Sequence, residues 1–141
     1  MKVGLASDHA GVALKQDLSQ QLGKLGNETL DFGPRDETSV DYPDYASLLC
    51  RSLLRGEIAR GILICGTGLG MAMAANRFPG IRAAPCATAE LARLTRLHNN
   101  ANVLCLGARF LKPETAWPVV EQFLRTDFEG GRHQARVEKL G

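Results

Sequence analysis

The sequence contains no apolar segment long enough to cross a membrane. It has 141 residues, 45% of them hydrophobic, but none of its apolar runs approaches the ~20 residues that a membrane-spanning helix requires. A secretory signal is missing too, because Ser7, Asp8 and His9 interrupt the apolar run near the N-terminus after a few residues. We therefore expect a cytoplasmic protein that does not enter a membrane.

An excess of charge of one sign is also missing. The 17 basic and 15 acidic side chains leave a net charge of +2, which is too small to indicate nucleic acid or a membrane surface as a partner. The ordinary apolar fraction excludes a disordered or fibrous chain. No linker, low-complexity tract or internal repeat divides the sequence, so it predicts one domain over residues 1–141.

The four cysteines show none of the spacings that metal sites and redox motifs use. Cys50, Cys65, Cys86 and Cys105 are far apart and include no CxxC pair. Without an export signal, free thiols are expected rather than disulfides. No two cysteine or histidine residues have the spacing of zinc ligands. The spacing therefore argues against a zinc site, and nothing else in the sequence indicates a cofactor.

Short apolar runs alternate with helical patterns along the chain. Pro85 must lie near an end of the fourth of five predicted strands, because proline has no N–H to donate. The alternation predicts an α/β fold, a doubly wound (Rossmann-like) five-stranded parallel sheet flanked by helices, with a short C-terminal helical tail. The predicted strands are 2–7, 28–32, 60–65, 81–86 and 102–107, and the predicted helices are 11–25, 44–55, 88–98, 113–125 and part of 130–141.

The stretch 65–70 (CGTGLG) joins a predicted strand to a predicted helix, the position where ligands bind in such sheets. Gly66, Gly68 and Gly70 let the backbone approach a ligand closely, and the N–H groups at the helix start suit a phosphate or a developing oxyanion. Met71 stands where a dinucleotide fingerprint needs its third glycine and where a C-x5-R phosphatase loop needs its arginine. A plain tight turn is the alternative.

Two side chains could move protons. Cys65 ends a predicted strand beside this loop, where a thiol can have a lowered pKa and act as a base or nucleophile. The alternative is a small core residue, and for the other three cysteines that is the preferred interpretation. His98 ends a predicted helix, and a partly buried histidine that caps the helix is the alternative there.

Other polar residues could bind an anion. Asp8 and His9 follow the first predicted strand and could hold a polar ligand, although Asp8 could equally cap the next helix. Arg132 and Arg136 are four residues apart, so they could share a helix face and clamp a phosphate. Arg109 follows the fifth predicted strand. A solvated basic surface is the alternative for these arginines.

Taken together, the motifs resemble one enzyme family over nearly the whole chain. Six blocks occur in the family's order: SDHAG (7–11), DYPDYA (41–46), GILICGTGLG (61–70), AANRFPGIRA (74–83), LHNNANVLCLGAR (97–109) and EGGRHQARVE (129–138). They are similar to those of the ribose-5-phosphate isomerase B family, which also includes galactose-6-phosphate and allose-6-phosphate isomerases.

The resemblance implies a metal-free aldose–ketose isomerase that interconverts ribose 5-phosphate and ribulose 5-phosphate through a cis-enediolate. It implies that Cys65 is the base, as in the thiol group of the family, since Met71 replaces the glutamate of the other group. Thr67 and His98 would assist ring opening. The implied binding residues are Asp8, Tyr42 and Asn99 for sugar hydroxyls, His9, Arg109, Arg132 and Arg136 for the phosphate, and the backbone of Gly66, Gly68 and Gly70 for the enediolate.

The predicted topology separates two of these residues. Cys65 lies at the carboxyl end of its strand, whereas His98 precedes a strand and so lies at the amino end of the sheet. A six-residue strand spans ~20 Å, far more than the ~3 Å of a hydrogen bond. We expect a two-fold homodimer in which His98 and Asn99 of one chain complete the Cys65 site of the other, in agreement with the resemblance. A tetramer of two such dimers stays open.

Three other functions fit parts of the pattern. A hexose 6-phosphate isomerase would need only a roomier pocket. A non-catalytic sugar-phosphate-binding module could use the same fold, because a fold does not define a function. A redox-sensing thiol protein is disfavoured by the lack of a second cysteine near Cys65.

Overall fold

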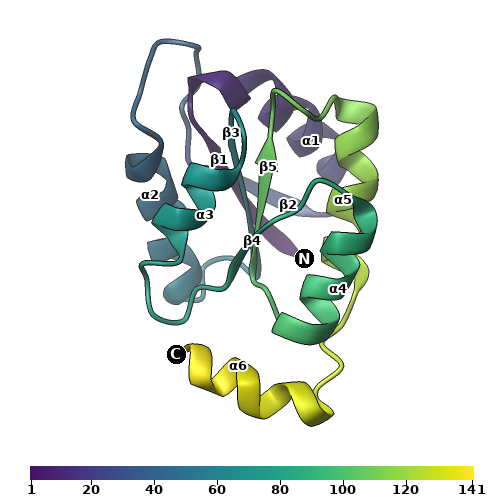
Figure 1. Cartoon of the computed structure of the whole chain (residues 1–141). Coiled ribbons are helices and arrows are strands. Elements are labelled where there is room, and N and C mark those ends of the chain that lie inside the picture. The colour runs from purple at the N-terminus through teal and green to yellow at the C-terminus, as the bar shows by residue number, and fades with distance from the viewer.

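A five-stranded parallel sheet lies at the centre of the molecule, with helices on both of its faces (Figure 1). The computed structural model describes residues 1–141. The strand order is β2-β1-β3-β5-β4, and every neighbouring pair is parallel. The predicted fold class is therefore confirmed. The strands are β1 (Lys2–Ser7), β2 (Glu28–Asp31), β3 (Arg60–Cys65), β4 (Ala83–Pro85) and β5 (Val103–Gly107).

The helices agree with the predicted ones, and local chemistry explains their ends. The helix predicted over 44–55 begins two residues earlier, because Pro43 suits the first turn of a helix. No helix is both long and apolar enough to cross a membrane. The helices are α1 (Val12–Lys24), α2 (Tyr42–Leu54), α3 (Leu69–Ala75), α4 (Ala89–Asn99), α5 (Pro113–Arg125) and α6 (Gln134–Leu140), with short 3-10 turns η1 (His9–Gly11) and η2 (Gly131–His133).

The fourth strand is shorter than the sequence predicts. A strand was expected over 81–86, but β4 contains only Ala83–Pro85. Proline has no N–H to donate, so it is confined to strand ends and edges, and β4 is indeed an edge strand of the sheet. Before it, the Arg82 N–H donates to the Asn102 side chain at 2.8 Å rather than to a neighbouring strand.

Each face of the sheet carries its own hydrophobic core. Side chains of a strand alternate between the two faces, so Ile62 and Ile64 of β3 pack with α1, α4 and α5, whereas Leu63 and Cys65 pack with α2 and α3. The burial of β3 and β5 on both faces explains why these two strands are continuous apolar runs. It also directs the Cys65 side chain toward the face that α2 and α3 cover.

The strand order defines where a ligand site can form. The chain leaves β1 toward β2 on one side and then returns to β3 on the other, so the order reverses between β1 and β3. The crevice at such a point, beyond the carboxyl ends of the strands, is the usual binding site of open α/β sheets. The C-terminal helix α6 lies at the opposite end of the sheet, below the end of α4 (Figure 1).

Phe123 provides a test of the core on the α1, α4 and α5 face. Its side chain is fully buried, whereas that of Phe110 is 74% exposed. Replacing Phe123 by alanine leaves a cavity, so we expect the free energy of unfolding to fall by about 3–5 kcal/mol. Phe110→Ala is the matched control and should change it by no more than about 0.5 kcal/mol. Urea denaturation measures both, and equal effects of the two substitutions would contradict the assigned core.

Candidate active site

The glycine loop after β3 turns tightly around the Cys65 side chain. The Gly68 N–H donates to the Cys65 sulfur at 3.1 Å. Gly68 has a φ of +80°, and a Cβ there would lie 3.0 Å from the Leu106 carbonyl carbon, so only glycine fits comfortably. The Thr67 hydroxyl accepts the Leu69 N–H at 3.2 Å. The loop thus presents a thiol, a hydroxyl and backbone N–H groups in a few residues.

Tyr42 and Arg109 lie against this loop from two sides. A Cβ built on Gly70 would lie 2.7 Å from Cζ of the Tyr42 ring, so the ring contacts the backbone there. A Cβ on Gly66 would lie 3.0 Å from the Arg109 Nε. The Arg109 N–H also donates to the Gly66 carbonyl at 3.0 Å, which fixes the loop after β5 beside the loop after β3. Both side chains reach the loop only because it consists of glycines at these positions.

Asp8 and His9 join the same end of the sheet from β1. The Asp8 N–H donates to the Ile64 carbonyl at 3.0 Å, next to Cys65. One Asp8 carboxylate oxygen accepts the Ala10 N–H at 2.9 Å, so its alternative role as a helix cap is confirmed for that oxygen. The His9 Nδ1 accepts the Val40 N–H at 3.2 Å, and in the neutral ring this leaves the proton on Nε2.

The other predicted residues gather at the opposite end of the sheet. His98 and Asn99 end α4, and Arg132 and Arg136 lie in η2 and α6. A cavity of about 270 Å³ opens there. Cys65 and this group are far apart, because Cys65 pairs with the last residue of β5 whereas α4 leads into its first. The cavity is lined by His98, Asn99, His133, Arg136, Val137 and Leu140.

His133 is a member of this second group that the sequence analysis did not assign. Its ring is buried and stacks on that of His98, with centroids 4.4 Å apart and planes at 20°. Burial lowers the His133 pKa, and the neighbouring His98, Arg132 and Arg136 lower it further. Glu129 acts in the opposite direction, but the net effect favours the neutral ring. The only sequence feature that points to His133 as a site residue is its position between Arg132 and Arg136 in the block GRHQAR.

His98, Glu129 and His133 are the side chains that come closest to a metal site. Their possible ligand atoms all lie within 4.8 Å of one another. A metal lies in the plane of each imidazole that binds it, so two rings stacked nearly parallel would have to turn before both could bind one ion. The positive charges of Arg132 and Arg136 beside His133 also oppose a cation.

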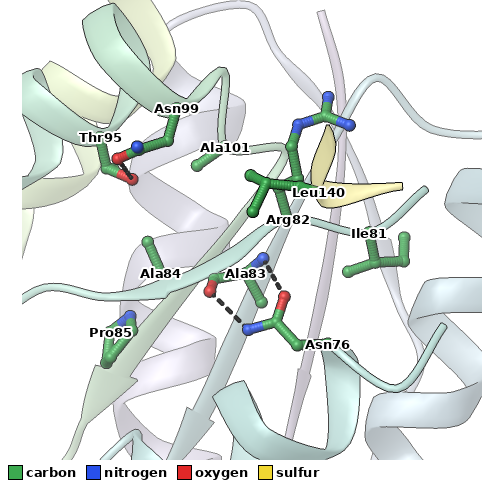
Figure 2. A pocket seen from close by; sticks show the side chains of 10 residues that line it. All are labelled: Asn76, Ile81, Arg82, Ala83, Ala84, Pro85, Thr95, Asn99, Ala101 and Leu140. Atoms are coloured by element: carbon green, nitrogen blue, oxygen red, sulfur yellow. Dashed lines mark hydrogen bonds between the residues drawn. The ribbon is translucent and has the colours of Figure 1, made fainter. Parts of the chain in front are cut away.

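A second cavity, about 450 Å³, lies along β4 and is lined by residues of α4 and α6 but not by Cys65. Figure 2 shows the side chains that line it. Asn76 exchanges two hydrogen bonds with the Ala83 backbone at one side of it, at 2.9 and 2.8 Å. Asn99 reaches it from α4, where its side-chain oxygen accepts the Thr95 hydroxyl at 3.2 Å. Asn99 therefore faces both cavities of the second group.

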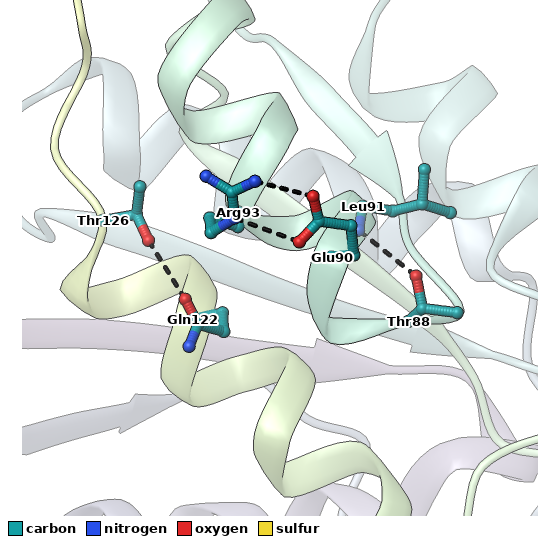
Figure 3. A network of polar contacts seen from close by, with 6 residues as sticks. All are labelled: Thr88, Glu90, Leu91, Arg93, Gln122 and Thr126. Atoms are coloured by element: carbon teal, nitrogen blue, oxygen red, sulfur yellow. Dashed lines mark hydrogen bonds and ion pairs between the residues drawn. The ribbon is translucent and has the colours of Figure 1, made fainter.

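Polar side chains at the start of α4 form contacts within that helix (Figure 3). The Thr88 hydroxyl accepts the Leu91 N–H at 3.2 Å and caps the helix, an interaction typically worth ~1 kcal/mol. Arg93 and Glu90 form an exposed ion pair at 2.6 Å, which contributes little to stability. These contacts lie at the start of the helix, and its last turn carries His98.

The fold is that of an open α/β protein, a class that usually binds its ligands beyond the carboxyl ends of the strands, where the candidate loop lies. The model of the Ribose/Galactose Isomerase family matches residues 3–140. The chain therefore belongs to the ribose/galactose isomerase family, as its motifs predict.

Relatives and solved structures agree with this assignment. Ribose-5-phosphate isomerase B of Escherichia coli (strain K12) is 43% identical over 139 residues, which cover 99% of this chain and 93% of that protein. A ribose 5-phosphate isomerase from Thermotoga maritima superposes with a TM-score of 0.97 at 50% identity, covering 99% and 96% of the two chains. The Mycoplasma genitalium enzyme with bound ribulose-5-phosphate has a TM-score of 0.93 at 42% identity, covering 99% and 93%.

The four thiols should differ strongly in reactivity. Burial raises the pKa of Cys50 to about 12, that of Cys86 to about 11, and that of Cys105 well above its usual range. Each pKa unit above the working pH reduces the thiolate about tenfold, so at pH 8 roughly one Cys86 in a thousand is ionised. We expect iodoacetamide at pH 8 to alkylate Cys65 first, as peptide mass spectrometry can follow. Cys65→Ala should lose the fast phase, and a fast phase at Cys86 would contradict the assignment.

Proposed function

We propose that this protein interconverts ribose 5-phosphate and ribulose 5-phosphate without a metal ion, with Cys65 as the base. The family and the names of its relatives support the substrate. The observation that carries the mechanism is the Cys65 sulfur, which accepts the Gly68 N–H at 3.1 Å within the glycine loop 65–70. A base and an oxyanion site then lie within the same few residues.

Proton transfer between carbon atoms needs both of these parts. A carbon next to a carbonyl is a weak acid, so its deprotonation requires a positioned base and stabilisation of the enolate oxygen. Cys65 removes the C2 proton of the open-chain aldose and returns it at C1, while the hydroxyl proton passes from O2 to O1. N–H groups of residues 66–70 other than those of Gly68 and Leu69, which already donate within the loop, hold the oxygen of the cis-enediolate. The thiolate is the form of a cysteine that can accept the proton.

The residues beside the loop bind the open-chain sugar. Asp8 has one carboxylate oxygen left after it caps η1, and this oxygen can accept a sugar hydroxyl. Tyr42 lies against Gly70 and can contact a second hydroxyl. His9 donates from Nε2, because its Nδ1 accepts the Val40 N–H. With Arg109, it forms the part of the phosphate site that this end of the sheet supplies.

The remaining residues come from a second copy of the chain. His98 and Asn99 lie at the amino end of the sheet with Arg132 and Arg136, too far from Cys65 to act on one sugar within one chain. In a two-fold homodimer this group of one protomer covers the Cys65 loop of the other. His98 of the partner subunit and Thr67 then pass protons to and from the ring oxygen and the anomeric hydroxyl, and Asn99 holds a hydroxyl.

The reaction itself is the first test. Protein treated with EDTA should convert ribose 5-phosphate to ribulose 5-phosphate, and Cys65→Ala should lower kcat by at least ~10²-fold, because a positioned general base contributes that much or more. Cys50→Ala is the matched control, since Cys50 is a fully buried cysteine of α2 that has no role in the proposed mechanism. Allose and galactose 6-phosphates are assayed beside the pentose.

The outcomes separate the alternatives. Turnover of a hexose phosphate alone would retain the mechanism and change the substrate. Activity that disappears with EDTA and returns with a metal would overturn the metal-free reaction. If folded protein turned over no sugar phosphate, a binding module would be the better interpretation.

Subunit mixing tests the shared site. Cys65→Ala and His98→Ala proteins should each be inactive alone, but their heterodimer contains one site with both native side chains. Random exchange makes half of the dimers heterodimers, so the mixture should reach about a quarter of the wild-type activity per chain. Mixing Cys65→Ala with the double variant should recover nothing. No recovery in the first mixture, once exchange is verified by mass, would exclude a site shared in this way.

A further inference from the structure

Lys15 of α1 is a fully buried cation that the mechanism above does not use. Its side chain is 0% exposed. The Nζ atom forms an ion pair with Asp31 Oδ1 at 2.9 Å and donates to the Pro34 carbonyl. Lysine is almost never fully buried unless it is paired, because removing a charge from water is costly. Lys15 therefore links α1 to the segment that follows β2.

The partners of Lys15 fix the beginning of the segment 32–41. Asp31 Oδ1 also accepts the Gly33 N–H at 2.8 Å. The Gly33 carbonyl in turn accepts the Ser7 N–H at 3.0 Å, one residue before Asp8. Pro34 is buried at this point. The ion pair thus fastens the segment to the end of β1, where the substrate residues begin.

The far end of the same segment touches two of those residues. The Val40 N–H donates to the His9 Nδ1 at 3.2 Å and so sets the orientation and tautomer of that ring. Two residues later, Tyr42 begins α2 and lies against Gly70. Between the two ends, residues 35–39 are exposed. The position of the segment therefore depends on its ends.

We propose that Lys15 is a positioning residue: through Asp31 and Pro34 it holds segment 32–41 in the place where Val40 orients His9 and α2 presents Tyr42 to the substrate. This role rests on the proposed function, because His9 and Tyr42 are substrate-binding residues only within it. The Cys65 loop is held separately, since the Cys65 and Gly66 carbonyls accept the N–H groups of Ala108 and Arg109 after β5. Loss of Lys15 should therefore weaken substrate binding and spare proton transfer.

Lys15→Met tests this separation. Methionine has a similar length and no charge, and Asp31, whose side chain is 41% exposed, can turn to water. We expect KM for ribose 5-phosphate to rise about tenfold with kcat within about twofold, because the lost contact acts on binding alone. Hydrogen exchange should accelerate in peptides covering 32–41 and stay unchanged in those covering 61–70. Lys24→Met is the matched control, an exposed lysine of the same helix.

A second variant keeps the test valid if Lys15→Met does not fold. Asp31→Asn retains an oxygen for the Gly33 N–H and removes only the charge. It should therefore raise KM too, but by a smaller factor than Lys15→Met. The proposal would be overturned if a folded variant showed unchanged KM and unchanged hydrogen exchange in peptides covering 32–41. It would also be overturned if kcat fell only in proportion to the amount of active protein and KM did not change. If wild-type protein showed no isomerase activity, the proposed function would fail, and the exchange measurement would still report whether Lys15 holds the segment.

Discussion

The burial of the central strands on both faces is the constraint on which the rest of the structure depends. β3 and β5 are covered by α2 and α3 on one face and by α1, α4 and α5 on the other, so no polar side chain from their middles can reach a ligand. Polar side chains that could contact a ligand are therefore confined to the two ends of the sheet. Because all strands run in one direction, each end collects the same kind of connection: loops that follow strands at one end and loops that precede them at the other.

The candidate site residues at the carboxyl end each give one polar atom to a bond within the fold and keep others for the proposed ligand. Asp8 uses one oxygen for the Ala10 N–H, and His9 uses Nδ1 for the Val40 N–H. Thr67 and Cys65 each accept a backbone N–H within the loop. These bonds fix the orientation of each side chain before a substrate arrives, which lowers the entropy lost on binding. The same bonds satisfy backbone groups that would otherwise be unpaired in a partly buried crevice.

The sequence predicts the features that depend on a local pattern of residues, and it does not predict those that depend on contacts between distant segments. The apolar runs at β3 and β5 and the helix starting at Pro113 are visible in it, as is Cys65 at a strand end. The strand order is not visible, because alternation along one strand does not identify its neighbours. Tyr42 became a candidate only by resemblance, and Arg109 only through its place after a predicted strand, since the contacts that bring both side chains to the loop are tertiary. Lys15 was missed because no spacing distinguishes it from an exposed lysine on the same helix.

The two edges of the sheet restrict how copies of this chain can associate. β4 has three residues and ends in Pro85, and β2 has four, with Glu28 and Asp31 at its ends. Edges this short, interrupted by proline or bounded by carboxylates, offer a poor template for another strand. A partner chain must therefore approach through helices and loops instead of extending the sheet. The same feature protects the folded protein against the edge-to-edge pairing that begins amyloid-like aggregation.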